Sequence, residues 1–246
     1  MFKNFLKYIV IASVLPVLAA CGIAKSDSPG PMVSKTYKVA GFSSVDIAGM
    51  FDVQITTGTD YSMKVELPKR VLESLTVNVQ DGCLVVREKD QNAFRNMSHE
   101  DFRIILSLPS LASVRGTGMV DFDLEGPVAQ TFTCSLTGMS EFDVETPLSL
   151  TDLSVDCTGM SKFEFASITA TGDADFNITG SSTVEGKTLT ANAFSADVSG
   201  KSDVDIAALN AASGSVNASG MSSVKAMGGN HPAVGATASG MSSVNL

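Results

Sequence analysis

Residues 131–165 read TFTCSLTGMSEFDVETPLSLTDLSVDCTGMSKFEF, and one pattern occurs in them twice, as TGMSEFDV and TGMSKFEF. The two copies start 21 residues apart, and similar segments recur through the rest of the chain. Self-similarity at a short fixed period is typical of repeat architectures, in which each unit packs on the next. The glycines that mark the repeat, at steps of 20 or 21 residues, are Gly118, Gly138, Gly159, Gly180, Gly200, Gly220 and Gly240.

Apolar and polar residues alternate on both sides of each repeat glycine. Around Gly138, for example, the apolar residues Cys134 and Leu136 stand four and two positions before the glycine, and Phe142 and Val144 stand four and six positions after it. A period of two predicts short strands with one buried face. The glycine predicts a corner where the backbone takes an angle that other residues disfavour.

The length of the repeat selects the fold class. About 20 residues leave no room for a helix beside the strands, and this half shows no period of 3.6 residues. The simplest packing stacks equivalent positions about 4.8 Å apart, one coil per repeat. We therefore predict an all-β fold, a parallel β-helix or solenoid that is regular over 114–246. A closed β barrel is the alternative, whereas propeller blades need about 40 residues each.

The region before the repeats alternates less regularly, and it predicts an irregular N-terminal β region within one domain, 35–246. An early relative of the repeat, AGMFDVQI, stands at 48–55. Asp81-Gly82 lies between two alternating runs and predicts a hairpin turn. The expected elements are two strands around Gly49 within 35–58, a strand at 61–68, one helical turn at 69–75, a hairpin at 75–89 and a polar loop at 90–100.

The first 20 residues have the layout of a secretory signal, with Lys3 and Lys7 before the short apolar run 8–20. The sequence LAAC at 18–21 resembles the bacterial lipobox, which implies cleavage after residue 20 and multiple acylation of Cys21. Two or more acyl chains give a stable membrane anchor. The expected segments are a lipoprotein signal peptide at 1–20 and a flexible Gly-, Ser- and Pro-rich tether at 21–34.

The alternative for this segment is ordinary signal cleavage near Ala20, with Cys21 as a plain thiol. Gly22, rather than an acidic residue, follows Cys21. By resemblance to Gram-negative lipoproteins, this implies sorting to the outer membrane. We therefore expect a lipid-anchored protein of the cell envelope, with its periplasmic or surface-exposed face left open.

Charge and motifs exclude several classes of function. The formal net charge is −9 and the isoelectric point about 4.6, so we expect no binding to nucleic acid. The two histidines, His99 and His231, lie in polar segments, and no nucleophile elbow, zinc-protease motif or phosphate loop is found. We therefore expect no catalytic residues, no cofactor and no enzymatic activity.

Three further cysteines, Cys83, Cys134 and Cys157, lack the Cys-x-x-Cys spacing of zinc sites. Cys134 stands four residues before its repeat glycine and Cys157 two residues before the next one. Both would point inward with an offset of two residues, and such diagonal neighbours are roughly 7 Å apart, too far for a disulfide. We predict buried free thiols.

One column of the predicted solenoid is acidic. Like charges at this spacing repel, so the column needs solvation, a neighbouring lysine or a bound cation. Calcium prefers clustered oxygen ligands, which leaves a calcium site as an alternative to a plain solvated face. The column consists of Asp123, Asp143, Glu164, Glu185 and Asp205.

A methionine follows most of the repeat glycines. If these side chains point outward, they form an apolar stripe suited to an adaptable partner or a lipid. If they fold over the corner, they seal the core. The neighbouring Ser and Thr residues are expected to form hydrogen-bonded stacks at the turns. The methionines are Met119, Met139, Met160, Met221 and Met241.

The predicted core becomes thinner toward the C-terminal end. The early coils contribute phenylalanines such as Phe132 and Phe163, whereas the last two contribute mainly Ala, Val and Gly. A bare final coil leaves unpaired strand edges. We therefore expect self-association through the C-terminal coil.

The whole pattern resembles the putative auto-transporter adhesin, head GIN domain family of Bacteroidetes-type bacteria, over about residues 38–245. The resemblance implies a right-handed β-helix, frequent lipoprotein signals and no catalytic residues. The segments that carry it are GFSSVDIAGMFDVQITTG at 41–58, YSMKVELP at 61–68, LVVREK at 84–89 and PSLASVRGTGMVDFDL at 109–124.

Three functions remain open from the sequence. The first is a non-enzymatic envelope lipoprotein that presents its solenoid for adhesion or ligand binding. The second is a carrier of lipid or another apolar ligand, which an exposed methionine stripe or a continuous apolar groove would favour. The third, a polysaccharide-degrading β-helix enzyme, would need a carboxylate pair beside Arg or Lys in a cleft.

Overall fold

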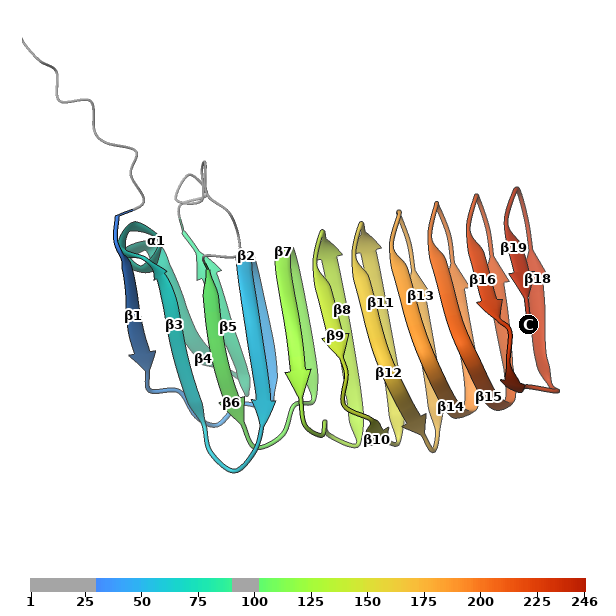
Figure 1. The fold of residues 1–246 in the computed structure, drawn as a ribbon, viewed down its shortest axis with the longest axis horizontal. Helices are drawn as coiled ribbons and strands as arrows, with labels where there is room; N and C mark the ends of the chain where they lie inside the picture. Colours follow the sequence, from blue (N-terminus) through green and yellow to red (C-terminus); the bar gives the residue numbers. More distant parts are fainter. Residues whose placement is uncertain (1–29, 90–101) are drawn as a thin grey trace, which may run out of the picture.

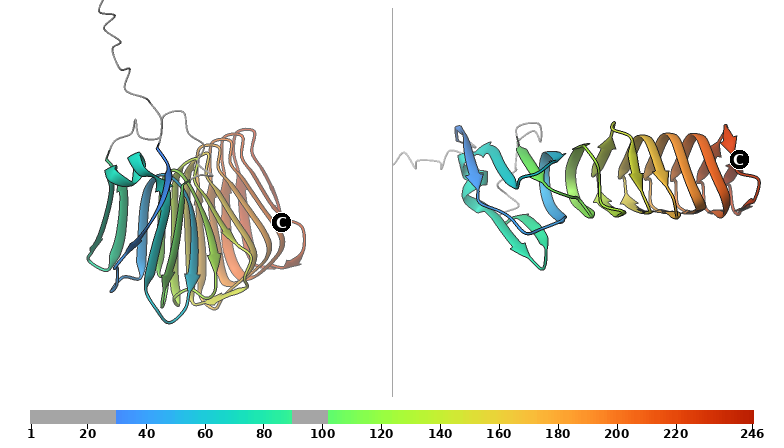
Figure 2. Two further views of the ribbon diagram at one scale, coloured as in Figure 1. Left: turned by 60° about the vertical axis from the view of Figure 1, so that its left-hand side comes forward. Right: turned by 90° about the horizontal axis from the view of Figure 1, so that it is seen from below.

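The repeats form a β-solenoid of about six turns spaced about 21 residues apart, as the sequence predicts. The computed structural model describes residues 30–89 and 102–246. All of its strands join one hydrogen-bonded sheet, and the coils follow one another in a single row (Figures 1 and 2). The right-handed winding stays a prediction from the family resemblance.

The regular coils consist of parallel strands in register. Gly138 pairs with Gly118 on one side and with Gly159 on the other. The strands are β7 (Ser113–Glu125), β8 (Thr131–Gly138), β9 (Glu141–Val144), β10 (Leu148–Leu150), β11 (Asp152–Gly159), β12 (Lys162–Ala170), β13 (Asp173–Ile178), β14 (Thr183–Val198), β15 (Asp203–Ala218), β16 (Ser223–Ala226), β17 (Gly229–Asn230), β18 (Val234–Ala238) and β19 (Ser243–Asn245).

The corner glycines adopt the backbone angle that the sequence predicts. Gly138 and Gly159 have φ values of 93° and 95°, which L side chains disfavour. A Cβ atom on Gly159 would also lie 2.7 Å from the carbonyl oxygen of Gly138. The corners therefore need glycine both for its backbone conformation and for the close approach of the next coil.

The early repeat relative at 48–55 forms a coil of its own. Strand β2 pairs in parallel with β7 from Ser44 to Thr56, and Gly49 stands opposite Gly118. We predicted two strands around Gly49, but the structure has one strand through it. The ladder continues because the φ of Gly49, 144°, turns the chain without ending its pairing with β7.

The N-terminal strands cover the first coil of the solenoid. β5 pairs with the first part of β2 and β6 with its second part, while β3 and β4 add antiparallel strands. The elements are β1 (Met32–Tyr37), β2 (Ser44–Thr57), β3 (Ser62–Pro68), α1 (Lys69–Ser74), β4 (Leu75–Gln80), β5 (Cys83–Glu88) and β6 (Arg103–Leu108).

Two local predictions for this region are confirmed. The helical turn is α1, and the hairpin joins β4 to β5 through Asp81 and Gly82, whose φ values are 49° and 75°. The predicted polar loop 90–100 lies outside the described residues. The predicted tether 21–34 extends too far, because Met32, Val33 and Ser34 already pair with β3. Within residues 30–89 and 102–246, no helix is long and apolar enough to cross a bilayer.

The core follows the inward columns of the repeat. Phe142 is fully buried, and its ring lies 5.8–6.0 Å from the rings of Phe122, Phe132 and Phe163. In the last coil the inward position of Ala236 is exposed, although its register partner in β15 is buried. The core therefore thins toward this end as predicted, while self-association through the last coil stays a prediction.

Candidate functional site

Each corner sends one side chain outward and the next one inward. From Gly138 onward the residue after the corner glycine is exposed, as for Met139 and Met160. The following serine is buried: Ser161 donates a hydrogen bond to the carbonyl oxygen of Thr158, and its own N–H donates to Ser182 of the next coil. These serines form the predicted hydrogen-bonded stack, and because they occupy the inside of their corners, the methionines that precede them do not seal the core.

The methionine column is a surface feature. The side chains of Met139, Met160, Met221 and Met241 are 49%, 62%, 47% and 78% exposed. The interpretation in which the methionines close the core is therefore wrong for these four residues. Met50 and Met119, which lie opposite each other in β2 and β7, are half-buried.

Four consecutive coils of this column form a groove, which we call the methionine groove. It is a cavity of about 910 Å³ whose apolar side chains come from Met50, Met119, Met139 and Met160. Its floor consists largely of corner backbone, because glycines carry no side chain to fill it. The other lining residues are Ala48, Gly49, Arg87, Glu88, Thr117, Gly118, Gly138 and Gly159.

Strand β5 supplies the polar residues at the N-terminal end of the groove. Arg87 forms an ion pair with Asp46, donates a 2.8 Å hydrogen bond to the backbone carbonyl of Asp46, and donates another to Val86. The guanidinium of Arg87 is therefore held by protein groups. Glu88 also lines the groove, so this end carries charges of both signs.

Beyond Met160 the methionine column is interrupted. The corner positions of the next two coils hold Ser181 and Lys201, both exposed. Met221 and Met241 follow, and neither lines the groove. The structure thus brings together Met119, Met139 and Met160 of the predicted stripe and leaves the other two apart.

Sequence reasoning missed part of the groove. The segment AGMF at 48–51 holds Met50 at the repeat position and was the available signal. Arg87 had no such signal, because it reaches the groove through the pairing of β5 with β2, which lie far apart in the chain.

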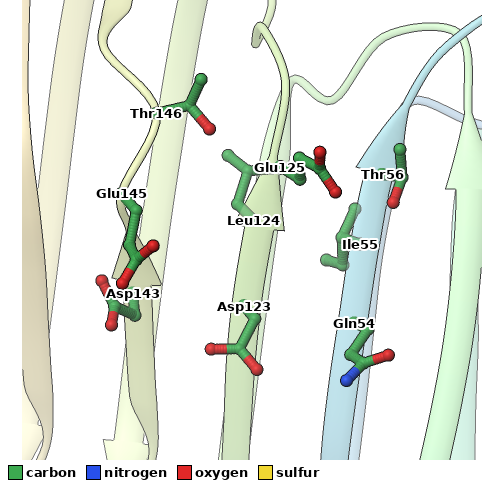
Figure 3. A pocket seen from close by; sticks show the side chains of 9 residues that line it. All are labelled: Gln54, Ile55, Thr56, Asp123, Leu124, Glu125, Asp143, Glu145 and Thr146. Atoms are coloured by element: carbon green, nitrogen blue, oxygen red, sulfur yellow. The ribbon is translucent and has the colours of Figure 1, made fainter.

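The acidic residues form the predicted column on a different side of the coils. Asp123 pairs with Asp143, Asp143 with Glu164, Glu164 with Glu185, and Glu185 with Asp205. Figure 3 shows the first part of this face, an open cavity of about 670 Å³. Its lining residues are Gln54, Ile55, Thr56, Asp123, Leu124, Glu125, Asp143, Glu145 and Thr146.

Partial burial and mutual repulsion act on these carboxylates. Burial, followed by the charges of Asp52 and Asp143, raises the pKa of Asp123. Burial, followed by the charges of Glu164 and Glu145, raises the pKa of Asp143. The negative charges on this face therefore oppose one another, which costs stability at neutral pH.

Lys162 offsets the repulsion in the middle of the face. Its Nζ lies 2.6 Å from Glu164, 3.3 Å from Glu185 and 3.8 Å from Glu141. The hydrogen bond with Glu164 is the main cause that raises the pKa of Lys162. In the part of the chain that the structure describes, no three acidic, histidine or cysteine side chains converge as metal ligands do. The calcium alternative gains no support from this geometry.

Cys134 and Cys157 lie where the sequence predicts, and Cys83 is a half-buried free thiol. Cys134 pairs with Val155 in register and Cys157 with Leu136, which is the predicted offset. Both thiols are free and buried, and burial raises the pKa of Cys157 to about 12. Thiolates are the reactive form of cysteine, so these two are inert in the folded protein. His231 lies in a turn between β17 and β18, and His99 lies outside the described residues.

The sequence places the chain in a family. Residues 41–229 match the family described as putative auto-transporter adhesin, head GIN domain. The chain belongs to this head GIN family. The match lies within the range 38–245 over which the resemblance was seen in the sequence. A search of the curated proteins finds no match.

Solved structures similar to this head GIN chain share its fold. One from Parabacteroides distasonis, described as a putative adhesin, has a TM-score of 0.67 and 14% identity, and the match covers 88% of this chain and 98% of that one. Another putative adhesin, from Bacteroides fragilis, has a TM-score of 0.65 and 17% identity, with 88% and 97% covered. A third, described as a putative lipid binding protein from Parabacteroides distasonis, has a TM-score of 0.57 and 14% identity, with 88% and 96% covered.

Proposed function

We propose that this protein is a non-enzymatic, lipid-anchored protein of the cell envelope that binds an apolar ligand in the methionine groove. The observation that carries the proposal is the exposure of Met139 and Met160 over a continuous apolar cavity. Exposed apolar surface of this kind marks interaction sites. The cavity volume lies within the range of about 300–1,000 Å³ that is usual for ligand sites.

The chemistry of the lining supports a ligand with little fixed shape. Methionine side chains are unbranched and polarizable, so they adapt to different apolar partners. Among the described residues that line the groove, they are the only apolar side chains apart from Ala48. The groove therefore favours contact with a flexible hydrocarbon over recognition of a rigid polar molecule.

The position of the expected anchor agrees with this function. The turns that follow β8, β11 and β13 lie along the upper edge in Figure 1, and β1 begins at the same edge. Cys21 stands nine residues before Gly30, a segment that extends at most about 30 Å. An acylated Cys21, sorted to the outer membrane as Gly22 implies, would hold the methionine edge near the bilayer, where apolar ligands are found.

The similar structure described as a putative lipid binding protein is consistent with the same assignment. Adhesion is the second candidate, and the observation that favours it is membership of the family described as putative auto-transporter adhesin, head GIN domain. An adhesive surface would then use the long acidic face, which is repetitive and partly exposed, and not the groove.

The groove is tested with the uncharged fluorescent probe N-phenyl-1-naphthylamine. We would use residues 22–246, which contain every residue of the described fold. The double variant Met139→Gln/Met160→Gln should bind the probe about tenfold more weakly, because it loses apolar contact at the centre of the groove. Met221→Gln/Met241→Gln, changed at the same repeat position outside the groove, should bind like the wild type. Equal loss in both variants, or no binding at all, would refute the assignment.

Protease treatment of intact and lysed cells separates the two candidates. Digestion on intact cells would place the solenoid outside, where adhesion is feasible. Protection on intact cells, with digestion after lysis, would place it in the periplasm and rule out a role in adhesion. Metabolic labelling with a radioactive fatty acid tests the anchor, since Cys21→Ala should abolish incorporation.

A further inference from the structure

We propose that the methionine groove holds a single acyl chain of an anionic amphiphile, with the chain along Met50 to Met160 and the head group beside Lys201. This inference rests on the proposed function, and it adds the class of ligand and its direction. Three observations carry it, namely the length of the groove, the charge at its two ends and the distribution of cations along the corner column.

The length of the groove matches one acyl chain. Met50, Met119, Met139 and Met160 occupy four consecutive coils, so three steps of about 4.8 Å separate the first from the last, about 14 Å in total. The hydrocarbon core of a bilayer is about 30 Å thick and two acyl chains deep, so one chain spans about 15 Å. Beyond Met160 the apolar lining ends at Ser181.

The charges at the two ends differ, which gives the ligand a direction. At the N-terminal end the guanidinium of Arg87 is already paired with Asp46, so an anion gains little from Arg87. At the other end Lys201 stands two coils beyond Met160, about 10 Å away. Lys201 is exposed and forms no ion pair with any residue in 30–89 or 102–246. Among the corner positions from Met50 to Met241, Lys201 is the one cation, so we place the acidic head group beside it.

A bilayer surface is a poorer occupant of the same edge. Attachment to anionic membranes uses clusters of several Lys or Arg side chains. The corner column from Met50 to Met241 carries one lysine, and the protein has a net charge of −9. A single amphiphile needs only one cation, which is what the column supplies.

The test measures displacement of N-phenyl-1-naphthylamine from residues 22–246 by amphiphiles below their micellar concentrations. Hexadecanoate and hexadecanoyl-lysophosphatidylglycerol represent the two sources of an anionic head group, and hexadecanoyl-lysophosphatidylcholine represents a head group without net charge. At least one anionic ligand should displace the probe, and octanoate should do so about tenfold more weakly than hexadecanoate, because a shorter chain buries fewer methylene groups. Lys201→Gln should weaken the anionic ligand about two- to fivefold, as for an exposed ion pair, without changing probe binding. Lys225→Gln should change neither.

Each outcome separates this inference from the proposed function. If the probe binds but no anionic amphiphile displaces it, or if Lys201→Gln weakens the lysophosphatidylcholine equally, the inference fails and apolar binding stands. If the probe does not bind, both fail. Cosedimentation with vesicles of phosphatidylglycerol and phosphatidylethanolamine, in the absence of monomer binding, would show that the edge docks on bilayers and would overturn the inference.

Discussion

The coils around Met139 and Met160 and the coils around Met221 and Met241 have the same corner sequence but different surroundings. In the first region four methionines stand on adjacent coils, and their side chains border one cavity. In the second region Ser181 and Lys201 separate two methionines from the others, and neither borders that cavity. A surface site on a solenoid therefore depends on continuity between neighbouring coils and not on the repeat motif alone.

The cores of the two regions also differ, because the buried side chains are larger in the early coils than in the late ones. The early coils contain a phenylalanine stack around Phe142, whereas the late coils contain smaller side chains such as Val216 and Ala218. Each coil packs only on its neighbours, so local stability follows local core volume. The early coils should therefore be locally more stable than the late ones, which suits them to carry a binding groove.

Phe142→Ala should produce the largest effect. The substitution removes a fully buried ring that touches three other rings, which costs about 3–5 kcal/mol of unfolding free energy. Val216→Ala, also fully buried, should cost about 2 kcal/mol because only two methyl groups are lost. Urea unfolding followed by circular dichroism measures both. Equal losses would show that the two regions do not differ in core strength.

Gly159→Ala should come next. The new Cβ atom would approach the Gly138 carbonyl oxygen to 2.7 Å at a positive φ, so we expect a loss of about 1–3 kcal/mol. Gly58→Ala is the matched control, because its Cβ atom would meet nothing within 4 Å. Thermal unfolding of the two variants should differ clearly. Similar melting temperatures would contradict the close packing of corner on corner.

Lys162→Met should cost about 1 kcal/mol at pH 7, because Glu141, Glu164 and Glu185 lose their shared cation. The raised pKa of Lys162 means that its contribution is complete below 10.5 and is lost as the pH rises through the higher value of the folded protein. Lys225→Met, in the late coils, should have a smaller effect. A stability difference that does not decline in strongly alkaline solution would contradict the role of this charge.

Asp143→Asn should have the smallest effect on stability and the opposite sign. Burial and neighbouring charges raise the pKa of Asp143, so the folded wild type binds a proton more readily than the unfolded chain and becomes relatively more stable as the pH falls. At pH 7 the variant should be more stable by a few tenths of a kcal/mol, roughly. The gain should disappear below the ordinary aspartate pKa of 3.8. Asp205→Asn is the control, since Lys225 stands opposite Asp205 in register.

The regular part of the fold could be predicted because it depends on patterns that are visible within each repeat. A period of two, a glycine at each corner and a step of 20 or 21 residues lead directly to stacked parallel strands. In the same way, the positions of Cys134 and Cys157 relative to their repeat glycines predicted that the two residues do not stand opposite each other. The single strand through Gly49 was missed, because whether a corner interrupts a strand depends on the backbone hydrogen bonds of the neighbouring coil.

The groove could be predicted only in part. The methionine column was visible in the sequence, but its direction depended on which residue of the corner is buried, and Ser161 takes that place. The contribution of Arg87 depends on the pairing of β5 with β2, and β3, α1 and β4 lie between these two strands in the chain, so no local pattern encodes it. The function of a repeat face is therefore harder to predict than its fold.

The most direct test of the account compares the six corner methionines within one molecule. Residues 22–246 would be labelled with ¹³C in the methionine methyl groups and titrated with N-phenyl-1-naphthylamine, while methyl resonances are recorded and assigned with single Met→Gln variants. We predict that the resonances of Met50, Met119, Met139 and Met160 shift together and saturate at one affinity, while those of Met221 and Met241 stay in place. Shifts of equal size at all six methyl groups, or none at the first four, would contradict a binding groove on the early coils.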